Sequence, residues 1–388
     1  MTIKSHNDWI KVLAFSGVFV PGYKGGGPIK TIKNLFEQAG DEITFKLITS
    51  DRDLGDTSPY TSVTCGVWNQ VGNASVFYSQ PGKTGYMQIA RELGAKDCDI
   101  VYLNSFFSLR FSIFPLLLAK LFRQKVVLAP RGEFSKGALA LKFLKKRLFI
   151  RLYRVLGLHK DTVFQVSSEF EAEDVRRVLG TSVDTWVAEN IGAKEFAEGI
   201  EPRTSVPLRA VFVSRISPKK NLLMALEMLR KVQQHLIYDI YGPVEDRDYW
   251  RKCEKVIAAL PPHIHVQRKG ELNPDDVVST LEKYDVFFFP TRGENYGHVI
   301  AEALCAGLPV VVADTTPWRN LQKLGIGWDL PLEAPDAFSA TLDELAVMPA
   351  KDHLRMRETV LSWAKSKFSQ RDAVEANIAL FKYAYEKK

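Results

Sequence analysis

Two glutamates in the second half of the sequence lie in a segment that otherwise reads as strand, turn and helix. Glu294 and Glu302 lie in TRGENYGHVIAEALCAGLPVV (291–311), with seven residues between them. The apolar run DVFFFP (285–290) predicts a buried strand, RGENYG a loop at its carboxyl end, and HVIAEALCAG a helix that ends at Gly307. The start of a helix presents unpaired N–H groups that suit an anion such as phosphate. An acid, an anion site and a second acid therefore match a sugar, a diphosphate and a ribose, because carboxylates accept hydrogen bonds from hydroxyls.

A second group of residues could hold the diphosphate of the same molecule. The segment VFVSRISPKKNLLMAL (211–226) reads as strand, basic turn and helix, and Arg215 and Lys220 are five residues apart in it. Arginine grips a phosphate with a two-pronged fork, whereas lysine acts as a point charge. Taken alone, the segment is more readily explained as a solvated basic turn. Together with the two glutamates, it favours phosphate binding.

Glycines cluster near the amino terminus, where FSGVFVPGYKGGGPIKTIKNLFEQ (15–38) predicts a strand, a loop and a helix. Gly26 and Gly27, in the loop, allow a backbone to approach a ligand closely. A dinucleotide fingerprint of the dehydrogenases is the alternative, but Lys30 stands where its third glycine would be. A plain turn is the remaining alternative.

These residues need a scaffold that brings loops to one edge of a sheet. Short β-branched or aromatic runs alternate with longer amphipathic segments, which predicts parallel sheets covered by helices on both faces. A polar seam at 188–207 separates two similar halves, and ligands of such folds sit beyond the carboxyl ends of the strands. The predicted strands are 9–17, 43–50, 98–105, 125–130 and 162–168, then 208–215, 235–242, 263–270, 284–291 and 308–314.

Composition limits the function classes. The 388 residues carry a formal net charge of +7 and a pI near 9.0, which favours an anionic partner. The start of the chain lacks the pattern of a signal peptide, and no apolar stretch is long enough to span a bilayer, so we expect a cytoplasmic enzyme. The cysteines are scattered without a metal-binding spacing, which fits a reducing compartment: Cys65, Cys98, Cys253 and Cys305.

The segment GENYGHVIAEALCAGLPVVVADTTPWRNL (293–321) resembles the E-x7-E signature of the retaining family-4 glycosyltransferases, in particular the bacterial cell-surface polysaccharide type. The resemblance implies that Glu294 lies against the donor sugar as a catalytic residue and that Glu302 holds the ribose. It also implies the GT-B fold, with two Rossmann-like doubly wound parallel-sheet domains facing an interdomain cleft. The expected domains are 1–195 for the acceptor and 205–370 for the nucleotide sugar, with a last helix, 371–388, that crosses back to the first.

The same resemblance assigns the other segments. Arg215 and Lys220 match the family's R-x4-K diphosphate pair, although Asn221 stands where the family has glycine. Gly26 and Gly27 match a glycine pair that faces the donor phosphate and acceptor. Arg131 stands where the family commonly has histidine; as a second catalytic residue it would stabilise the leaving phosphate or bind a phosphate of the acceptor. Further donor-binding residues are expected at Asn295, Tyr296, Gly297, His298, Val299, Gly270 and Leu272.

The implied function is a retaining hexosyltransferase that moves sugar from a nucleotide-diphospho-sugar to a glycan or lipid-linked acceptor in bacterial surface polysaccharide or lipopolysaccharide synthesis. No cofactor or metal is expected. Asp51-Arg-Asp53 and Asp246-Arg-Asp248 both fit the metal-binding Asp-x-Asp pattern of another glycosyltransferase fold, which shows how common that pattern is. The alternative function is a sugar-nucleotide epimerase or hydrolase of the same architecture. Nucleic acid is not an expected partner, because the chain lacks aromatic RNA-binding motifs.

The segment 136–160 is rich in lysine, arginine and large apolar residues and holds no acid. Basic amphipathic helices commonly rest on anionic membranes, so we expect a peripheral contact with the inner face of the cytoplasmic membrane. The alternative is a core-packed helix with a solvated cationic face.

Overall fold

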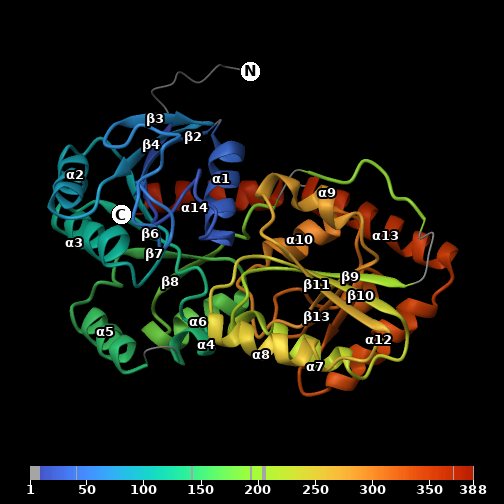
Figure 1. Cartoon of the computed structure of the whole chain (residues 1–388). Helices are drawn as coiled ribbons and strands as arrows, with labels where there is room; N and C mark the ends of the chain where they lie inside the picture. Colours follow the sequence, from blue (N-terminus) through green and yellow to red (C-terminus); the bar gives the residue numbers. More distant parts are fainter. Residues whose placement is uncertain are drawn as a thin grey trace, which may run out of the picture. The chain divides into compact units, whose positions relative to one another are not determined.

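The computed structural model describes residues 9–40, 42–140, 143–192, 195–202, 207–369 and 371–387. The chain divides into two compact units (Figure 1). Unit 1 comprises Met1–Ile191 and Arg371–Lys388, and unit 2 comprises Gly192–Gln370. The predicted domain boundaries at 205 and 370 fall outside the described residues.

Unit 1 is built on an eight-stranded sheet in the order β3-β4-β2-β1-β5-β6-β7-β8. All neighbouring strands are parallel except β3 and β4, which form an antiparallel pair at one edge. The parallel strands other than the edge strand β8 are fully or largely buried, as expected when helices cover both faces. In chain order the strands are β1 (Ile10–Phe15), β2 (Ile43–Ser50), β3 (Trp68–Val71), β4 (Ala74–Ser79), β5 (Ile100–Leu103), β6 (Lys125–Leu128), β7 (Thr162–Val166) and β8 (Asp184–Val187).

The helices of unit 1 include the last helix of the chain. Helix α14 packs against α1 and the strands β1, β5 and β6, and Phe381 on it contacts the rings of Phe45 and Tyr102. The helices are α1 (Gly27–Ala39), α2 (Lys83–Gly94), η2 (Leu109–Ile113), α3 (Phe114–Leu121), α4 (Lys136–Ala140), α5 (Phe143–Val155), α6 (Glu169–Leu179) and α14 (Asp372–Glu386).

Unit 2 holds a six-stranded, wholly parallel sheet in the order β11-β10-β9-β12-β13-β14. Its strands are β9 (Leu208–Val213), β10 (Leu236–Tyr241), β11 (Ile264–Gly270), β12 (Val286–Phe289), β13 (Val310–Ala313) and β14 (Gly327–Leu330). Its helices are η3 (Pro218–Lys220), α7 (Leu222–Leu229), α8 (Arg247–Ile257), η4 (Pro274–Asp276), α9 (Val277–Leu281), α10 (His298–Cys305), α11 (Leu321–Leu324), α12 (Pro335–Val347) and α13 (Ala350–Ser369).

The ten strands predicted from the sequence are all confirmed, but four others were missed. Strands β3, β8 and β14 have few fully buried residues, and β4 follows β3 after a tight turn, so none of them gave a long apolar run. The helix predicted after the basic turn is α7, which begins at Leu222 and ends at Leu229. Among the described residues, no helix combines the length and the apolar character needed to cross a bilayer.

Candidate active site

In unit 2, the carboxyl end of β12 leads through a short loop to the start of α10. Gly297 caps this start with φ 82°, a left-handed conformation that favours glycine. A Cβ atom there would come within 3.2 Å of the indole nitrogen of Trp318, so the loop has little room for any other residue. The first N–H groups of α10 therefore lie at the carboxyl edge of the sheet, where ligands of open α/β sheets bind.

Glu294 and Lys220 form a direct ion pair at this edge. The Lys220 ammonium donates to both carboxylate oxygens of Glu294, at 2.8 and 2.9 Å. Only 13% of the Lys220 side chain and 10% of the Glu294 side chain are exposed. The Thr291 hydroxyl donates to the same carboxylate at 3.0 Å. Two groups from different turns thus hold the Glu294 carboxylate in one orientation.

Asn221 explains how the basic turn and the β12 loop are joined. Its backbone is left-handed, with φ 61°, a conformation that asparagine tolerates better than most residues, so it can replace the family's glycine. Its side-chain amide donates to the carbonyl of Pro290 at 2.8 Å and accepts from the Arg292 Nε at 3.0 Å. The turn that carries Lys220 is therefore fixed to the loop that carries Glu294.

The other predicted cation of this turn is engaged differently. Arg215 pairs with Glu245 at 3.1 Å, and both side chains are more than a third exposed. Such an exposed pair contributes little free energy, so a ligand phosphate can replace Glu245 at low cost. Arg215 and Lys220 lie on the same turn, but only Lys220 is held against Glu294.

The residues around α10 pack as a block behind the loop. The ring of Tyr296 contacts those of His298 and Trp318, with centroids 4.8 and 5.6 Å apart. Glu302 is buried in the helix, and burial together with the Glu302 charge raises the pKa of Cys305 to about 12. Val299 packs partly buried against the core. Asn295 lies in the loop itself.

Gly270 is the last residue of the edge strand β11, and Leu272 follows it in the next loop. The Gly270 carbonyl accepts a hydrogen bond from the Gly242 N–H at 2.7 Å, and Gly270 has φ 91°. Leu272 is partly buried against the unit 2 core. Both positions thus belong to the same carboxyl edge of the sheet as Lys220 and Glu294.

In unit 1, Asp53 organises the glycine-rich loop after β1. One of its carboxylate oxygens accepts from the backbone N–H of Tyr23 at 2.8 Å and of Lys24 at 3.1 Å. A Cβ on Gly22 would lie 2.2 Å from the Tyr60 hydroxyl, so this glycine has no room for a side chain. The loop ends at Gly26 (φ 64°), and Gly27 begins α1. No sequence pattern indicated this role of Asp53 or Gly22.

The acids of the two Asp-x-Asp matches are engaged in local structure. Asp51 pairs with Arg52 at 2.8 Å, and Asp53 holds the loop described above. Asp246 caps α8 by accepting from the Tyr249 N–H, and Asp248 pairs with Arg251. No group of three or more possible metal ligands occurs within the part of the chain that the structure describes.

Arg131 lies after β6 in unit 1, with φ 53°. Its guanidinium donates to the side chains of Asn190 at 2.8 Å, Tyr102 at 2.6 Å and Asn104 at 2.7 Å. All three acceptors are buried and neutral. Sequence reasoning missed these partners, because nothing in their types or spacing connects them to Arg131.

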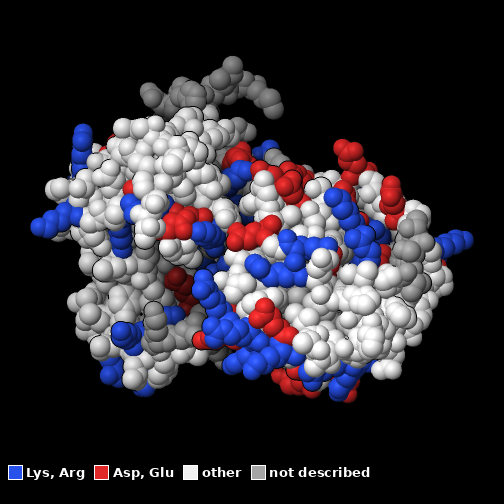
Figure 2. All heavy atoms as spheres, viewed as in Figure 1, with Lys and Arg blue, Asp and Glu red and all other residues white. Residues whose placement is uncertain are grey.

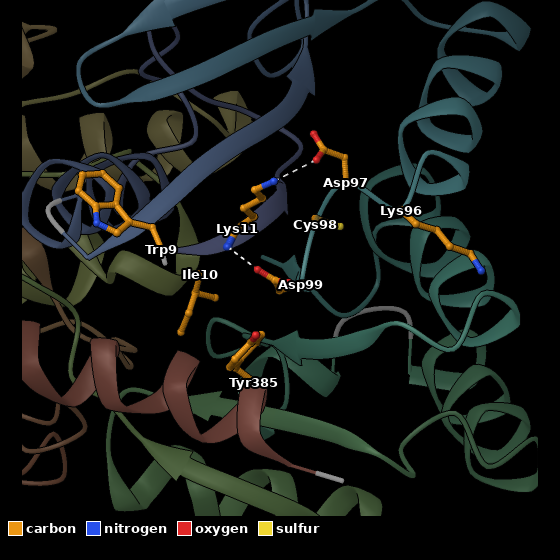
Figure 3. A pocket seen from close by; sticks show the side chains of 8 residues that line it. All are labelled: Trp9, Ile10, Lys11, Lys96, Asp97, Cys98, Asp99 and Tyr385. Atoms are coloured by element: carbon orange, nitrogen blue, oxygen red, sulfur yellow. Dashed lines mark hydrogen bonds and ion pairs between the residues drawn. The ribbon is translucent and has the colours of Figure 1, made fainter. Parts of the chain in front are cut away.

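A hollow of unit 1 lies at the opposite edge of its sheet, by the amino ends of β1 and β5 (Figure 3). Lys11 forms an ion pair with Asp97 at 3.3 Å, and its backbone N–H donates to Asp99 at 2.8 Å. Burial raises the pKa of the Cys98 thiol to about 11, so the thiol is not activated. Because ligands of this fold class bind at the carboxyl ends of strands, we assign no chemistry to this hollow.

Comparison with known proteins places the unit 2 geometry in context. Residues 194–361 match the family described as Glycosyl transferases group 1. The phosphatidyl-myo-inositol mannosyltransferase of Mycobacterium tuberculosis is 31% identical over 148 residues, which are 36% of this chain and 37% of that protein. The putative colanic acid biosynthesis glycosyltransferase WcaL of Salmonella typhimurium is 27% identical over 172 residues, 42% of this chain and 41% of WcaL. The chain thus matches well under half the length of these curated relatives.

Solved structures resemble the whole chain. HepE of Anabaena, in complex with UDP and glucose, has a TM-score of 0.67 at 16% identity and covers 96% of this chain and 98% of its own. WaaG, a glycosyltransferase involved in lipopolysaccharide biosynthesis, has a TM-score of 0.66 at 14% identity, with 95% and 99% covered. These neighbours and the two parallel-sheet units confirm the predicted GT-B fold.

Proposed function

We propose, from the premise that residues 194–361 form a group 1 glycosyl transferase domain, that this chain transfers a sugar from a nucleotide-diphospho-sugar to a glycan or lipid-linked acceptor. The observation that carries the proposal is the buried Lys220–Glu294 pair beside the start of α10. A cation, a carboxylate and the amino-terminal end of helix α10 meet there at the carboxyl edge of a parallel sheet. Those groups suit a diphosphate joined to a polyhydroxylated sugar.

The roles of the individual residues follow from their chemistry. Lys220 and Arg215 would hold the diphosphate, with Arg215 exchanging Glu245 for a phosphate oxygen. The N–H groups near Gly297, His298 and Val299 would supplement these cations. Fixed positive charge beside the leaving diphosphate stabilises the negative charge that develops as the glycosidic bond breaks. Glu302 would hold the ribose, and Gly270 and Leu272 would lie beside the base.

The finer features of the reaction are also part of the proposal. Glu294 would orient the donor sugar, and the leaving phosphate would take the proton of the attacking hydroxyl on the same face, which retains the configuration. No metal takes part in this scheme, because Lys220, Arg215 and the helix N–H groups supply the positive charge. The glycine-rich loop of unit 1, held by Asp53, would face the donor phosphate and acceptor.

A screen of nucleotide sugars tests the proposal directly. A donor present at about 100 times its Kd should stabilise the protein by about 2.7 kcal/mol, which raises the melting temperature by a few degrees. The assay then follows that donor with extracts of lipid-linked or soluble glycan acceptors by mass spectrometry. Sugar transferred to an acceptor supports the proposal. A product that is only free sugar, or an epimer of the donor, contradicts it and favours the hydrolase or epimerase alternative.

The exposed surface of helix α5 supports the proposal that the acceptor is bound to a membrane. Its only buried residue is Tyr153, whereas Leu144, Leu148 and Val155 are at least 70% exposed. Exposed basic side chains are interleaved with them: Lys145, Arg147, Arg151 and Arg154. We propose that this face rests on an anionic membrane, with the leucines inserted between the acyl chains. Within the predicted segment 136–160, residues 141 and 142 lie outside the described residues.

On the face in Figure 2, Lys and Arg side chains are interspersed with Asp and Glu side chains. On that face, acidic side chains interrupt the basic ones, whereas nucleic-acid-binding surfaces commonly form an uninterrupted basic stripe.

A vesicle-binding experiment tests the membrane contact. We expect the chain to co-sediment with phosphatidylglycerol-containing vesicles and not with pure phosphatidylcholine vesicles. The double substitution Leu144→Ser and Leu148→Ser should weaken binding at least about tenfold, because burying each leucine is worth about 1.5–3 kcal/mol. The control is Val347→Ser, at a position of unit 2 that is 64% exposed. Equal binding by the control and the double variant would contradict a role for α5.

A further inference from the structure

Arg131 is the first member of a chain of buried hydrogen bonds that ends on the last helix. Its Nη2 donates to the Tyr102 hydroxyl, and Tyr102 donates to Gln165 Oε1. The Gln165 amide donates to Asn377 Oδ1 at 2.7 Å, and Asn377 lies on α14. Tyr102, Gln165 and Asn377 are each at most 2% exposed. The four side chains therefore join the end of β6 to a helix nearly 250 residues further along the chain.

Chemistry fixes the direction of every bond in this chain. A guanidinium can only donate, so the Tyr102 oxygen must accept and its hydrogen must point to Gln165. Gln165 then presents its oxygen to Tyr102 and its NH₂ to Asn377. The NH₂ group of Asn377 donates in turn to the carbonyl oxygens of Glu189 at 2.9 Å and Ala373 at 2.7 Å. Each group directs its acceptor end toward Arg131, and the aligned dipoles stabilise a positive charge there.

No carboxylate neutralises that charge among the residues that the structure describes. The remaining guanidinium contacts, to Asn104 and Asn190, are amide oxygens. The nearby carboxylate of Glu171 instead accepts from the N–H of Gly132 at 2.6 Å and from the N–H and hydroxyl of Ser167, both at 2.8 Å. Proteins usually pair a partly buried arginine with an acid, because desolvated charge is costly. In unit 1, the Arg131 guanidinium instead donates hydrogen bonds to neutral side chains.

We propose that this arrangement keeps Arg131 as an oriented but uncompensated cation for a phosphate group of the substrates, and that Gln165 and Asn377 are its positioning residues. The inference rests on the proposed function. A carboxylate partner would hold the guanidinium equally well but would cancel its charge. Neutral acceptors hold it and leave the charge available to an incoming anion. The phosphate belongs either to the leaving diphosphate or to the acceptor.

Substitutions at Asn190 separate the effect of a hydrogen-bond acceptor for Arg131 from the effect of a negative charge beside Arg131. Asn190→Asp keeps an oxygen acceptor at the same place and adds a negative charge, and Asn190→Ser keeps a neutral acceptor. We expect Asn190→Asp to lower kcat/KM about 100-fold, comparable to the loss of one charge-stabilising donor, and Asn190→Ser to lower it far less. Asn73→Asp, an exposed residue of unit 1, controls for added charge. Wild-type kcat/KM in Asn190→Asp would overturn the proposal.

The two sources of phosphate give different results in the same variants. With UDP-glucose as the probe, slow hydrolysis without acceptor reports the leaving diphosphate alone. If Asn190→Asp slows hydrolysis and transfer equally, the anion is the leaving diphosphate. If it raises the KM of the acceptor and leaves hydrolysis unchanged, the anion is a phosphate of the acceptor.

A spectroscopic measurement tests the positioning residues without any activity. In protein labelled with ¹⁵N-arginine, the signal of the Arg131 Nη2 hydrogens, which bond to Tyr102 and Asn104, is identified by its loss in Arg131→Lys. We expect Asn377→Leu and Gln165→Met to speed its hydrogen exchange about tenfold or more, and Asn190→Asp to leave it slow. An unchanged exchange rate in both Asn377→Leu and Gln165→Met overturns the positioning role. If instead the wild type transfers no sugar but exchange responds as expected, the proposed function fails and the positioning of Arg131 stands.

Discussion

A Glu294→Gln variant is expected to transfer sugar about a thousandfold more slowly than the wild type, with donor affinity changed less than about threefold. The carboxylate is fixed by Lys220 and Thr291, so in the proposed reaction it would act as an oriented negative charge beside the sugar. Glutamine keeps its shape and one acceptor oxygen but loses the charge. That loss is felt most when positive charge develops on the sugar in the transition state. Single-turnover kinetics and calorimetric donor binding measure the two effects separately.

Asp248→Asn is the matched control for Glu294→Gln. It makes the same acid-to-amide change on unit 2, at a side chain that is 83% exposed and paired only with Arg251 on its own helix. It should leave turnover and donor binding at wild-type values. Normal turnover in Glu294→Gln would remove Glu294 from the mechanism, and equal loss in both variants would indicate a nonspecific effect of charge.

A Lys220→Met variant is expected to lose about 3 kcal/mol of stability in unit 2. Methionine fills a similar volume, but among the described residues it leaves the buried Glu294 carboxylate with the Thr291 hydroxyl as its remaining side-chain donor. Removing one member of a buried ion pair costs about 3–5 kcal/mol of stability. Because both side chains of this pair keep a small exposed fraction, we expect a loss at the lower end of that range. Urea denaturation followed by tryptophan fluorescence measures the change. Donor binding should weaken in the same variant, because a cation of the diphosphate site is gone.

Two further variants test whether the loss of stability in Lys220→Met comes from an unpaired buried charge. Lys231→Met breaks an ion pair with Asp336 in which both side chains are more than half exposed, so it should cost less than about 1 kcal/mol. The double variant Lys220→Met and Glu294→Gln removes both charges and should recover most of the lost stability but not the activity. If Lys220→Met is no less stable than Lys231→Met, the pair is not buried in solution.

The fold was accessible from the sequence because its strands are buried on both faces. Runs such as DVFFFP and LPVVVAD have no polar alternation, which is typical of a parallel sheet between helices. Strand β14 was missed because only its first residue is buried, so GWDL lacks that pattern. The antiparallel pair of β3 and β4 at the sheet edge gave no long apolar run either.

The sequence predicted the segments that form the candidate site, but not how these segments come together. The sequence indicated that Lys220 and Glu294 follow two strands, but strand order in the sheet is not chain order. Strands β9 and β12 are neighbours although β10 and β11 lie between them in the sequence, and that adjacency brings the two side chains together. The partners of Arg131 could not be predicted either, because they come from distant parts of the sequence. Tyr102 and Asn377 are 275 residues apart and are connected through Gln165.

The return of α14 to unit 1 has a consequence for biosynthesis. The ribosome completes residues 1–191 first, yet the last layer over the sheet of unit 1, formed by α14, emerges only after all of unit 2. At about 5–20 residues per second, the nascent first domain waits on the order of 10–40 seconds with the apolar surface beneath Phe381 exposed. During that interval it is a substrate for chaperones, and premature termination before residue 371 would leave it permanently in that state.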